Sequence, residues 1–187
     1  MARLPYLSRE DLPPERRQLL DRPINLFRAL AHGPEVLEWM SEIGGWIRYR
    51  CRLDPRLREL AIIQVGFLTQ SRYEFSHHVK IGLDFGVTDA DLRELVADTR
   101  GEPTSLGEQE RAVLRAAREL TVGTELSDET WSRLRQFLPP DRLLDLLFVV
   151  THYVQVVRML GALQIDVEED YAPYLELLSV AGPEGAR

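Results

Sequence analysis

Hydrophobic and polar positions along this chain recur with the period of helices, and strand signals are nearly absent. Apolar residues lie three and four positions apart over long stretches, which is typical of helices that bury one face. Proline, glycine and short polar side chains separate these stretches where helices begin and end. The pattern predicts helices at about 24–31, 34–49, 55–69, 72–85, from 88 onward, 106–122, 127–137, 141–164 and 171–180.

The predicted helix at 55–69 has the clearest start and the most unusual surface. Asp54 supplies a side-chain cap, and Pro55 follows at the first helical position, where its missing N–H costs nothing. Apolar residues lie on nearly every side of this helix, so we expect it to be buried between other helices. Glu59 and Gln64 are its polar exceptions.

Capping patterns predict where two other helices begin, and the apolar period predicts which side of the helix at 34–49 is buried. Thr88-x-x-Asp91 opens one helix, and Ser105-x-x-Glu108 predicts a capping box before another. The helix at 34–49 is expected to bury an apolar stripe along one side. That stripe comprises Val36, Leu37, Met40, Ile43 and Ile47.

Length and pattern indicate a single all-α domain. The chain has 187 residues, and no long polar linker divides it. Residues 1–23, rich in proline and charge, are expected to form an N-terminal arm with one helical turn. Residues 181–187 are expected to form a flexible tail.

The net charge and the hydropathy of the chain argue against binding to nucleic acid and against a membrane span. The chain has 23 basic and 30 acidic residues, a net charge of −7, which argues against a nucleic-acid-binding protein with a basic surface. Its most apolar run, 143–150, is short and contains Asp145, so no membrane span is expected. The N-terminal residues lack a signal-peptide pattern, and we predict a cytoplasmic protein.

The cysteine and lysine counts exclude several chemistries. Cys51 is the only cysteine, which rules out an intrachain disulfide, a two-cysteine redox cycle and a cysteine-rich zinc site. We expect it to be a small, partly buried residue without chemistry. Lys80 is the only lysine, so a Schiff base could form only there.

The segment from residue 71 to 78 concentrates groups that can transfer protons. On a helix, Glu74, His77 and His78 share a face, because residues three and four apart are neighbours. A carboxylate beside an imidazole fixes its tautomer and raises its basicity. Glu59, on the preceding apolar helix, needs a cation or a cavity to offset the burial of its charge.

These residues resemble a known family. Glu59, Ser71, Glu74 and His78 form the pattern E-x11-S-x2-E-x3-H, which resembles the carboxymuconolactone decarboxylase family, including its alkylhydroperoxidase-D-like members. The redox branch of that family has E-x11-C-x2-C-x3-H. The other branch lacks the cysteines and has an aromatic–Glu–aromatic run, which 73–75 resembles. The resemblance is firm over residues 54–95 and implies the alkylhydroperoxidase-D-like type of helical bundle.

The resemblance also indicates which residues of this chain occupy the motif positions of the family. The family glutamate and histidine fall on Glu59 and His78, and the two redox cysteines fall on Ser71 and Glu74. A histidine that some redox members carry between their cysteines falls on Tyr73. A serine and a glutamate cannot cycle through sulfenate and disulfide, so the peroxidase role is not inherited.

The resemblance implies a decarboxylase-like lyase that uses acid–base catalysis without a cofactor on a small organic acid or lactone. His78 is the expected proton donor, Glu74 orients it, and Glu59 is a second acid or base. His77 is a further catalytic candidate. The expected substrate-binding residues are Ser71, Arg72 and Tyr73, with Arg58 as an alternative arginine for a substrate carboxylate. The resemblance further implies a homo-oligomer, as a dimer, trimer or hexamer.

Each assignment has a structural alternative. Glu74 and His78 could form an ordinary surface pair, and His77 could face solvent or a subunit contact. Glu59 could form a salt bridge to Arg56 or to another arginine. His152 could be a hydrogen-bonded core histidine, or its helix could bring it to the same cavity as the motif.

Three further hypotheses concern the whole protein. Glu74-x-x-His77 matches one unit of a di-iron carboxylate site, but no second unit occurs, so no metal is expected. The alternative is one metal ion bound by this Glu/His/His set together with Glu59. A peroxidase relative with a degenerate redox motif would have to work through Cys51. A non-catalytic helical module would retain the scaffold and a filled apolar interior.

Overall fold

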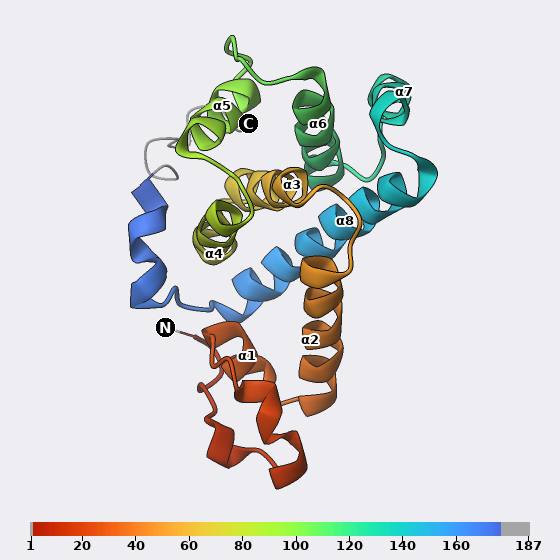
Figure 1. Cartoon of the computed structure of the whole chain (residues 1–187). Coiled ribbons are helices and arrows are strands. Elements are labelled where there is room, and N and C mark those ends of the chain that lie inside the picture. The colour runs from red at the N-terminus through yellow and green to blue at the C-terminus, as the bar shows by residue number, and fades with distance from the viewer. Residues whose placement is uncertain (1, 177–187) are drawn as a thin grey trace.

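The computed structural model describes residues 2–176, which form eight α-helices and three 3-10 helices, with no strand among them. This confirms the prediction of an all-α fold. The elements are η1 (Arg9–Asp11), η2 (Pro14–Leu20), α1 (Asn25–Leu30), α2 (Pro34–Tyr49), α3 (Pro55–Leu68), α4 (Arg72–Asp84), α5 (Asp89–Thr99), α6 (Glu108–Val122), α7 (Asp128–Phe137), α8 (Pro140–Leu163) and η3 (Glu169–Leu175). In Figure 1, α3 and α4 lie centrally, with α5–α7 at one end and α1 and α2 at the other.

α3 is the central helix of the core. Every residue from Leu57 to Phe67 is buried, and the helix packs against α4, α6 and α8. The Oδ1 atom of Asp54 accepts a hydrogen bond from the Leu57 N–H at 3.0 Å, and Pro55 follows at the first helical position. The expected cap and the expected burial on all sides are both confirmed.

α3 and α4 approach each other closely because a glycine lies where they meet. A Cβ atom on Gly66 would lie 2.9 Å from the backbone nitrogen of Phe75. The chain turns between the helices through Gln70, which has a positive φ of 52°. Ser71 then caps α4 by accepting a hydrogen bond from the Glu74 N–H at 3.4 Å. This tight connection brings the polar residues of α3 and α4 together.

α8 is long and apolar enough to cross a membrane by length and composition, with a mean hydropathy of 1.6 over its most apolar window. In the fold it runs diagonally across the molecule (Figure 1) and packs against α3 and α6. Leu146, Val149 and Val150 are fully buried in these contacts. α8 is therefore a partly buried core helix.

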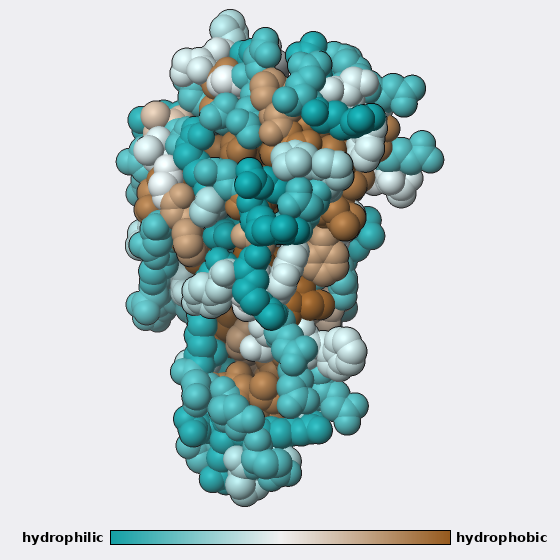
Figure 2. All heavy atoms as spheres, turned by 45° about the vertical axis from the view of Figure 1, so that its right-hand side comes forward, coloured by the Kyte–Doolittle hydropathy of each residue, from teal (hydrophilic) through white to brown (hydrophobic). Residues whose placement is uncertain are grey.

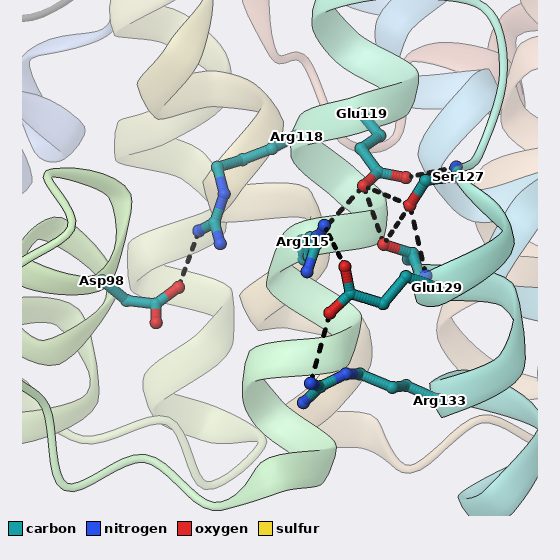
Figure 3. A network of polar contacts seen from close by, with 8 residues as sticks. Asp98, Arg115, Arg118, Glu119, Ser127, Glu129 and Arg133 are labelled. Atoms are coloured by element: carbon teal, nitrogen blue, oxygen red, sulfur yellow. Dashed lines mark hydrogen bonds and ion pairs between the residues drawn. The ribbon is translucent and has the colours of Figure 1, made fainter.

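Ion pairs hold α5 and α7 against α6 (Figure 3). Arg118 pairs with Asp98 of α5 at 2.7 Å, and Arg115 pairs with Glu129 of α7 at 3.0 Å. Glu119 accepts hydrogen bonds from the N-terminal residues of α7. Because α6 also packs against α3, this network fixes one side of the central helix.

Two local predictions are wrong. Ser105 and Glu108 do not form a capping box, because α6 begins at Glu108 with Gly107 at its cap. The Ser105 N–H instead donates to Glu94 of α5 at 2.6 Å, which holds this loop outside the helix. Val36 was expected in the buried stripe of α2 but is 51% exposed.

α2 has apolar residues on two faces. Leu37, Met40 and Ile47 are buried, whereas Val36 and Trp39 lie together on the exposed side. Figure 2 turns the right-hand side of Figure 1 forward and shows apolar side chains between polar ones on that surface. Apolar periodicity alone could not tell which face of α2 meets the core.

The ends of the described chain are more ordered than expected. The N-terminal arm contains η1 and η2 rather than one helical turn, and Leu12 and Leu20 are buried in it. Where the predicted helix at 171–180 is described, the chain forms the 3-10 helix η3, which contains Pro173, a residue without an N–H for α-helical bonding. Residues 177–180 of that prediction lie outside the described residues. The predicted tail at 181–187 lies outside the described residues.

The close approach of α3 and α4 predicts opposite effects for two glycine substitutions. Gly66→Ala should lower the free energy of unfolding by about 1–3 kcal/mol, because the backbone of Phe75 cannot easily move away. Gly161→Ala, in α8, has no heavy atom within 4 Å of its new Cβ and should raise stability by up to about 1 kcal/mol. Urea denaturation measures both; equal stabilities for the two variants would contradict the packing argument.

Candidate active site

The four predicted catalytic side chains are buried where α3 meets α4. Glu59 comes from α3, and Glu74, His77 and His78 come from successive positions of α4. Each is at most 6% exposed. The alternative that Glu74 and His78 form an ordinary surface pair does not fit this burial.

His78 lies between two carboxylates. Its Nδ1 is 2.7 Å from Glu59 Oε2, and its Nε2 is 3.0 Å from Glu74 Oε1. Burial by itself lowers the pKa of His78, but the charges of both glutamates and the hydrogen bonds to them raise it from its ordinary 6.5 to about 9. The ring is therefore an imidazolium at neutral pH, with both N–H groups directed at carboxylates.

Glu59 is held by a second cation. The Nε atom of Arg58 donates to Glu59 Oε1 at 2.9 Å, so the two oxygens of this carboxylate face different cations. Burial raises the pKa of Glu59, but His78 and Arg58 outweigh it and the pKa is lowered. The expected arginine partner exists, and it is Arg58 rather than Arg56, which pairs with Asp91.

His77 has a separate carboxylate partner. Its Nε2 is 2.8 Å from Oε2 of Glu168, which precedes η3. The imidazole lies between the rings of Tyr73 and Tyr171, at centroid distances of 4.1 and 3.6 Å. Burial lowers the pKa of His77 despite the neighbouring carboxylate. The two adjacent histidines therefore differ in charge at neutral pH.

A cavity of about 280 Å³ adjoins these groups, a size near the lower end for small-molecule sites. Most of its remaining wall is apolar or aromatic, with two arginines. The lining residues are Arg22, Ile24, Leu26, Phe27, Met40, Ser41, Gly44, Gly45, Arg48, Tyr49, Tyr73, Glu74, His77, His78, Ile81, His152, Tyr153 and Val156. His152 thus reaches the same cavity as the motif.

The structure places the other predicted binding residues elsewhere. Ser71 caps α4, Arg72 is exposed, and neither lines the cavity. Arg58 is buried against Glu59 and lies over the ring of Phe85. Of the three residues predicted to bind substrate, only Tyr73 lines the cavity.

Sequence reasoning missed Arg48, Tyr153 and Glu168. Arg48 and Tyr153 line the cavity from α2 and α8, and Tyr153 packs edge-on against His78 at 4.7 Å. Burial raises the pKa of Tyr153, so it stays a neutral phenol. The polar pair at 152–153 in an apolar helix was a usable signal. Nothing local marks Arg48 or Glu168.

Cys51 is remote from this chemistry. Its Sγ is 3.8 Å from a carboxylate oxygen of Asp145, and it does not line the cavity. Burial and Asp145 raise the pKa of the thiol. Within residues 2–176 no group of three or more His, Cys, Asp or Glu side chains is arranged to hold a metal ion. Within the Glu-x-x-His unit, Glu74 contacts His78 whereas His77 contacts Glu168.

Comparison with known proteins agrees with the motif. Residues 34–119 match the carboxymuconolactone decarboxylase family. The match covers less than half of the chain, and it shows that this segment is similar to that family. The segment includes Glu59, Glu74, His77 and His78 but ends before α8 and η3. No curated protein gives a significant match to the chain.

Solved structures share the whole fold. The alkylhydroperoxidase AhpD core of an uncharacterized peroxidase-related protein from Ralstonia eutropha JMP134 is 19% identical, with a TM-score of 0.73 over 95% of this chain and 96% of that one. The debrominase Bmp8, as a Cys-to-Ala variant in complex with 2,3,4-tribromopyrrole, is 17% identical. Its TM-score is 0.76, and the alignment covers 95% of this chain and 98% of that one. The apo form of Bmp8 is 16% identical, with a TM-score of 0.74, and the alignment covers 92% of this chain and 96% of that one. At these identities the similarity establishes the alkylhydroperoxidase-D-like fold only.

The raised pKa of His78 predicts a pH-dependent stability. Its folded pKa of about 9 lies above the ordinary 6.5, so the charged ring stabilises the fold fully below pH 6.5 and loses this contribution as the pH rises through about 9. The loss corresponds to about 3 kcal/mol. Urea unfolding of wild type and His78→Gln between pH 6 and pH 10 measures it. Parallel pH profiles for the two proteins would contradict the assignment.

Proposed function

We propose that this protein is a decarboxylase-like lyase that acts by acid–base catalysis, without a cofactor, on a small organic acid or lactone. The observation that carries this proposal is the buried series Glu59, His78 and Glu74 at the wall of a small cavity. The similarity of residues 34–119 to the carboxymuconolactone decarboxylase family supports the reaction class. The homo-oligomeric assembly and the cytoplasmic location remain predictions.

The reaction needs an acid at the substrate carbon. In decarboxylation, the bond to the carboxylate carbon breaks, carbon dioxide leaves, and the electron pair stays on the organic fragment. A conjugated lactone carbonyl can delocalise that pair until a proton is added to carbon. The enzyme must therefore supply one proton and recover it from water.

The Glu59–His78–Glu74 series can supply this proton. His78 holds a proton on each nitrogen, and Glu59 stabilises the ring as a fixed negative charge on Nδ1. Glu74 lines the cavity and contacts Nε2, so a proton can move from His78 to Glu74 and on to the substrate. Glu74 takes the place of the second motif cysteine, which supports proton transfer in place of thiol chemistry.

Arg48 can hold the substrate carboxylate. It lines the cavity from α2, it is half-buried, and no carboxylate pairs with it among residues 2–176. A guanidinium matches a carboxylate with two parallel hydrogen bonds. We assign this role to Arg48 in place of Arg72, which does not reach the cavity.

The alternatives have less support. A peroxidase role would rest on Cys51, which lies outside the cavity and whose thiol pKa is raised. A purely structural module would not need four ionisable residues buried beside an open cavity, because well-packed apolar residues stabilise a core at least as well.

Conservative substitutions in the series test the function. With carboxymuconolactone as the first substrate, Glu74→Gln and His78→Gln should each lower kcat for carbon dioxide release by about 10²–10⁴-fold, because the proton path is broken. Glu42→Gln, on the exposed side of α2, is the matched control and should keep the wild-type rate.

Circular dichroism checks that the variants fold. Wild-type turnover in both site variants would refute the assigned proton path. Failure of the wild-type protein to release carbon dioxide from carboxymuconolactone or related lactone acids would refute decarboxylation.

A pair of arginine variants tests substrate binding. Arg48→Ala should raise KM by about 10- to 100-fold, because a charged hydrogen bond to the carboxylate is worth about 1.5–3 kcal/mol. Arg72→Ala removes the same charge from an exposed position outside the cavity and should leave KM unchanged. Steady-state kinetics separates the two; a larger effect at Arg72 would reverse the assignment.

A further inference from the structure

The pair formed by His77 and Glu168 borders the proposed cavity but takes no part in the proton path described above. His77 lines the cavity beside Glu74 and His78. Its carboxylate partner lies outside the segment that matches the family. The pair therefore unites a motif residue with a part of the chain for which the motif assigns no role.

The hydrogen bonds of Glu168 fix its charge and direction. Oε1 accepts from the Asn25 N–H at 2.6 Å and from the Tyr73 hydroxyl at 3.2 Å, and Oε2 faces His77. Burial raises the pKa of Glu168, but the interactions with His77 and Asn25 lower it overall. Glu168 is therefore a carboxylate that accepts three hydrogen bonds and donates none.

The tautomer of His77 follows from this partner. Because Glu168 can only accept, Nε2 of His77 must carry its proton. Burial keeps the ring neutral near pH 7, so Nδ1 has a lone pair. No described residue forms a hydrogen bond with that nitrogen, although the side chain lines the cavity.

Stacking fixes the plane of the ring. Tyr73 stacks on one face of His77 with an interplanar angle of 16°, and Tyr171 stacks on the other with an angle of 6°. The ammonium group of Lys80 lies 4.5 Å from the centre of the Tyr171 ring. Stacking and the bond to Glu168 together hold the imidazole in one orientation, as a proton acceptor requires.

We propose that Nδ1 of His77 is a general base of this cavity, positioned by Glu168 and by the two tyrosines, and opposed to the acid formed by Glu59, His78 and Glu74. This rests on the proposed function and extends it to substrates that must lose a proton. Nδ1 takes a proton from a C–H or O–H bond, the electron pair stays on the substrate, and Glu74 adds a proton at a second atom. His77 then releases its proton to water, and the Glu59–His78–Glu74 series regains from water the proton that it gave. Proton-shift isomerisation of an unsaturated acid or lactone needs these two groups, so the cavity supports that reaction class as well.

Nuclear magnetic resonance tests the base without any substrate. In protein labelled with nitrogen-15, imidazole spectra at pH 7 should show His77 as the neutral Nε2–H tautomer and His78 as an imidazolium. Groups that face His77 are Glu168 and Tyr171 from the C-terminal segment and Tyr73, Glu74 and His78 from α4. A protonated His77, or its Nδ1–H tautomer, would overturn the proposal.

Diethyl pyrocarbonate tests whether the lone pair is open to the cavity. Nδ1 attacks the carbonyl carbon, ethyl carbonate leaves, and the proton on Nε2 passes to solvent. Mass spectrometry should find His77 modified and His78 spared, because both nitrogens of His78 carry protons. His152 lines the same cavity, burial lowers its pKa, and no carboxylate among the described residues pairs with it, so it is the internal control. Modification of His152 without His77 would overturn the proposal.

Matched variants test the role of Glu168. Glu168→Gln should lower the midpoint of the pH dependence of His77 modification by about one unit, because a charge that favours the imidazolium is lost. Glu169→Gln removes the same charge from an exposed neighbour and should leave the midpoint unchanged. An unchanged midpoint in Glu168→Gln would contradict the positioning role. The imidazole spectra and the His77 modification are measured without turnover. They can therefore contradict the role of His77 while the protein still releases carbon dioxide, and a failure to release carbon dioxide leaves them unaffected.

Discussion

A buried imidazolium between two carboxylates is the interaction on which this site depends. His78 and Arg58 supply two positive charges, and Glu59 and Glu74 supply two negative ones, so the buried set is neutral. Removing one member leaves an unpaired charge in the core, which typically costs about 3–5 kcal/mol. The same interaction keeps His78 charged beside the cavity, where a substrate proton can be exchanged. Stability and proposed chemistry therefore rest on one set of contacts.

Backbone geometry makes that set possible. Gly66 lets α3 approach the backbone of α4 closely, and the turn at Gln70 and the cap at Ser71 connect the two helices within a few residues. Ser71 thus has a structural role in a position where redox relatives carry a cysteine. The family segment builds this helix pair, whereas α8 and η3 complete the cavity and its surroundings from outside that segment.

Two adjacent histidines on one helix have opposite properties because their surroundings differ. His78 meets two carboxylates and is held as a cation, whereas His77 meets one carboxylate and two aromatic rings and is held neutral. Their side chains project about 100° apart around the helix axis, so each reaches a different neighbour. One cavity thereby contains a charged proton donor and a neutral proton acceptor.

The sequence by itself determined the eight α-helices, apart from the start of α6, and the members of the central motif. Local signals sufficed for these, because the cap at Asp54 and the apolar period of α3 act over only a few residues. The i,i+4 spacing of Glu74 and His78 likewise predicted an acid–base pair, and the family resemblance added Glu59 to it. Only the tertiary structure decided which arginines line the cavity and that Glu168 meets His77, because residues 91 positions apart become neighbours only when the chain is packed. It also decided that Ser71 caps α4, since a short polar side chain can either cap a helix or face a ligand, and only the position of its neighbours selects between them.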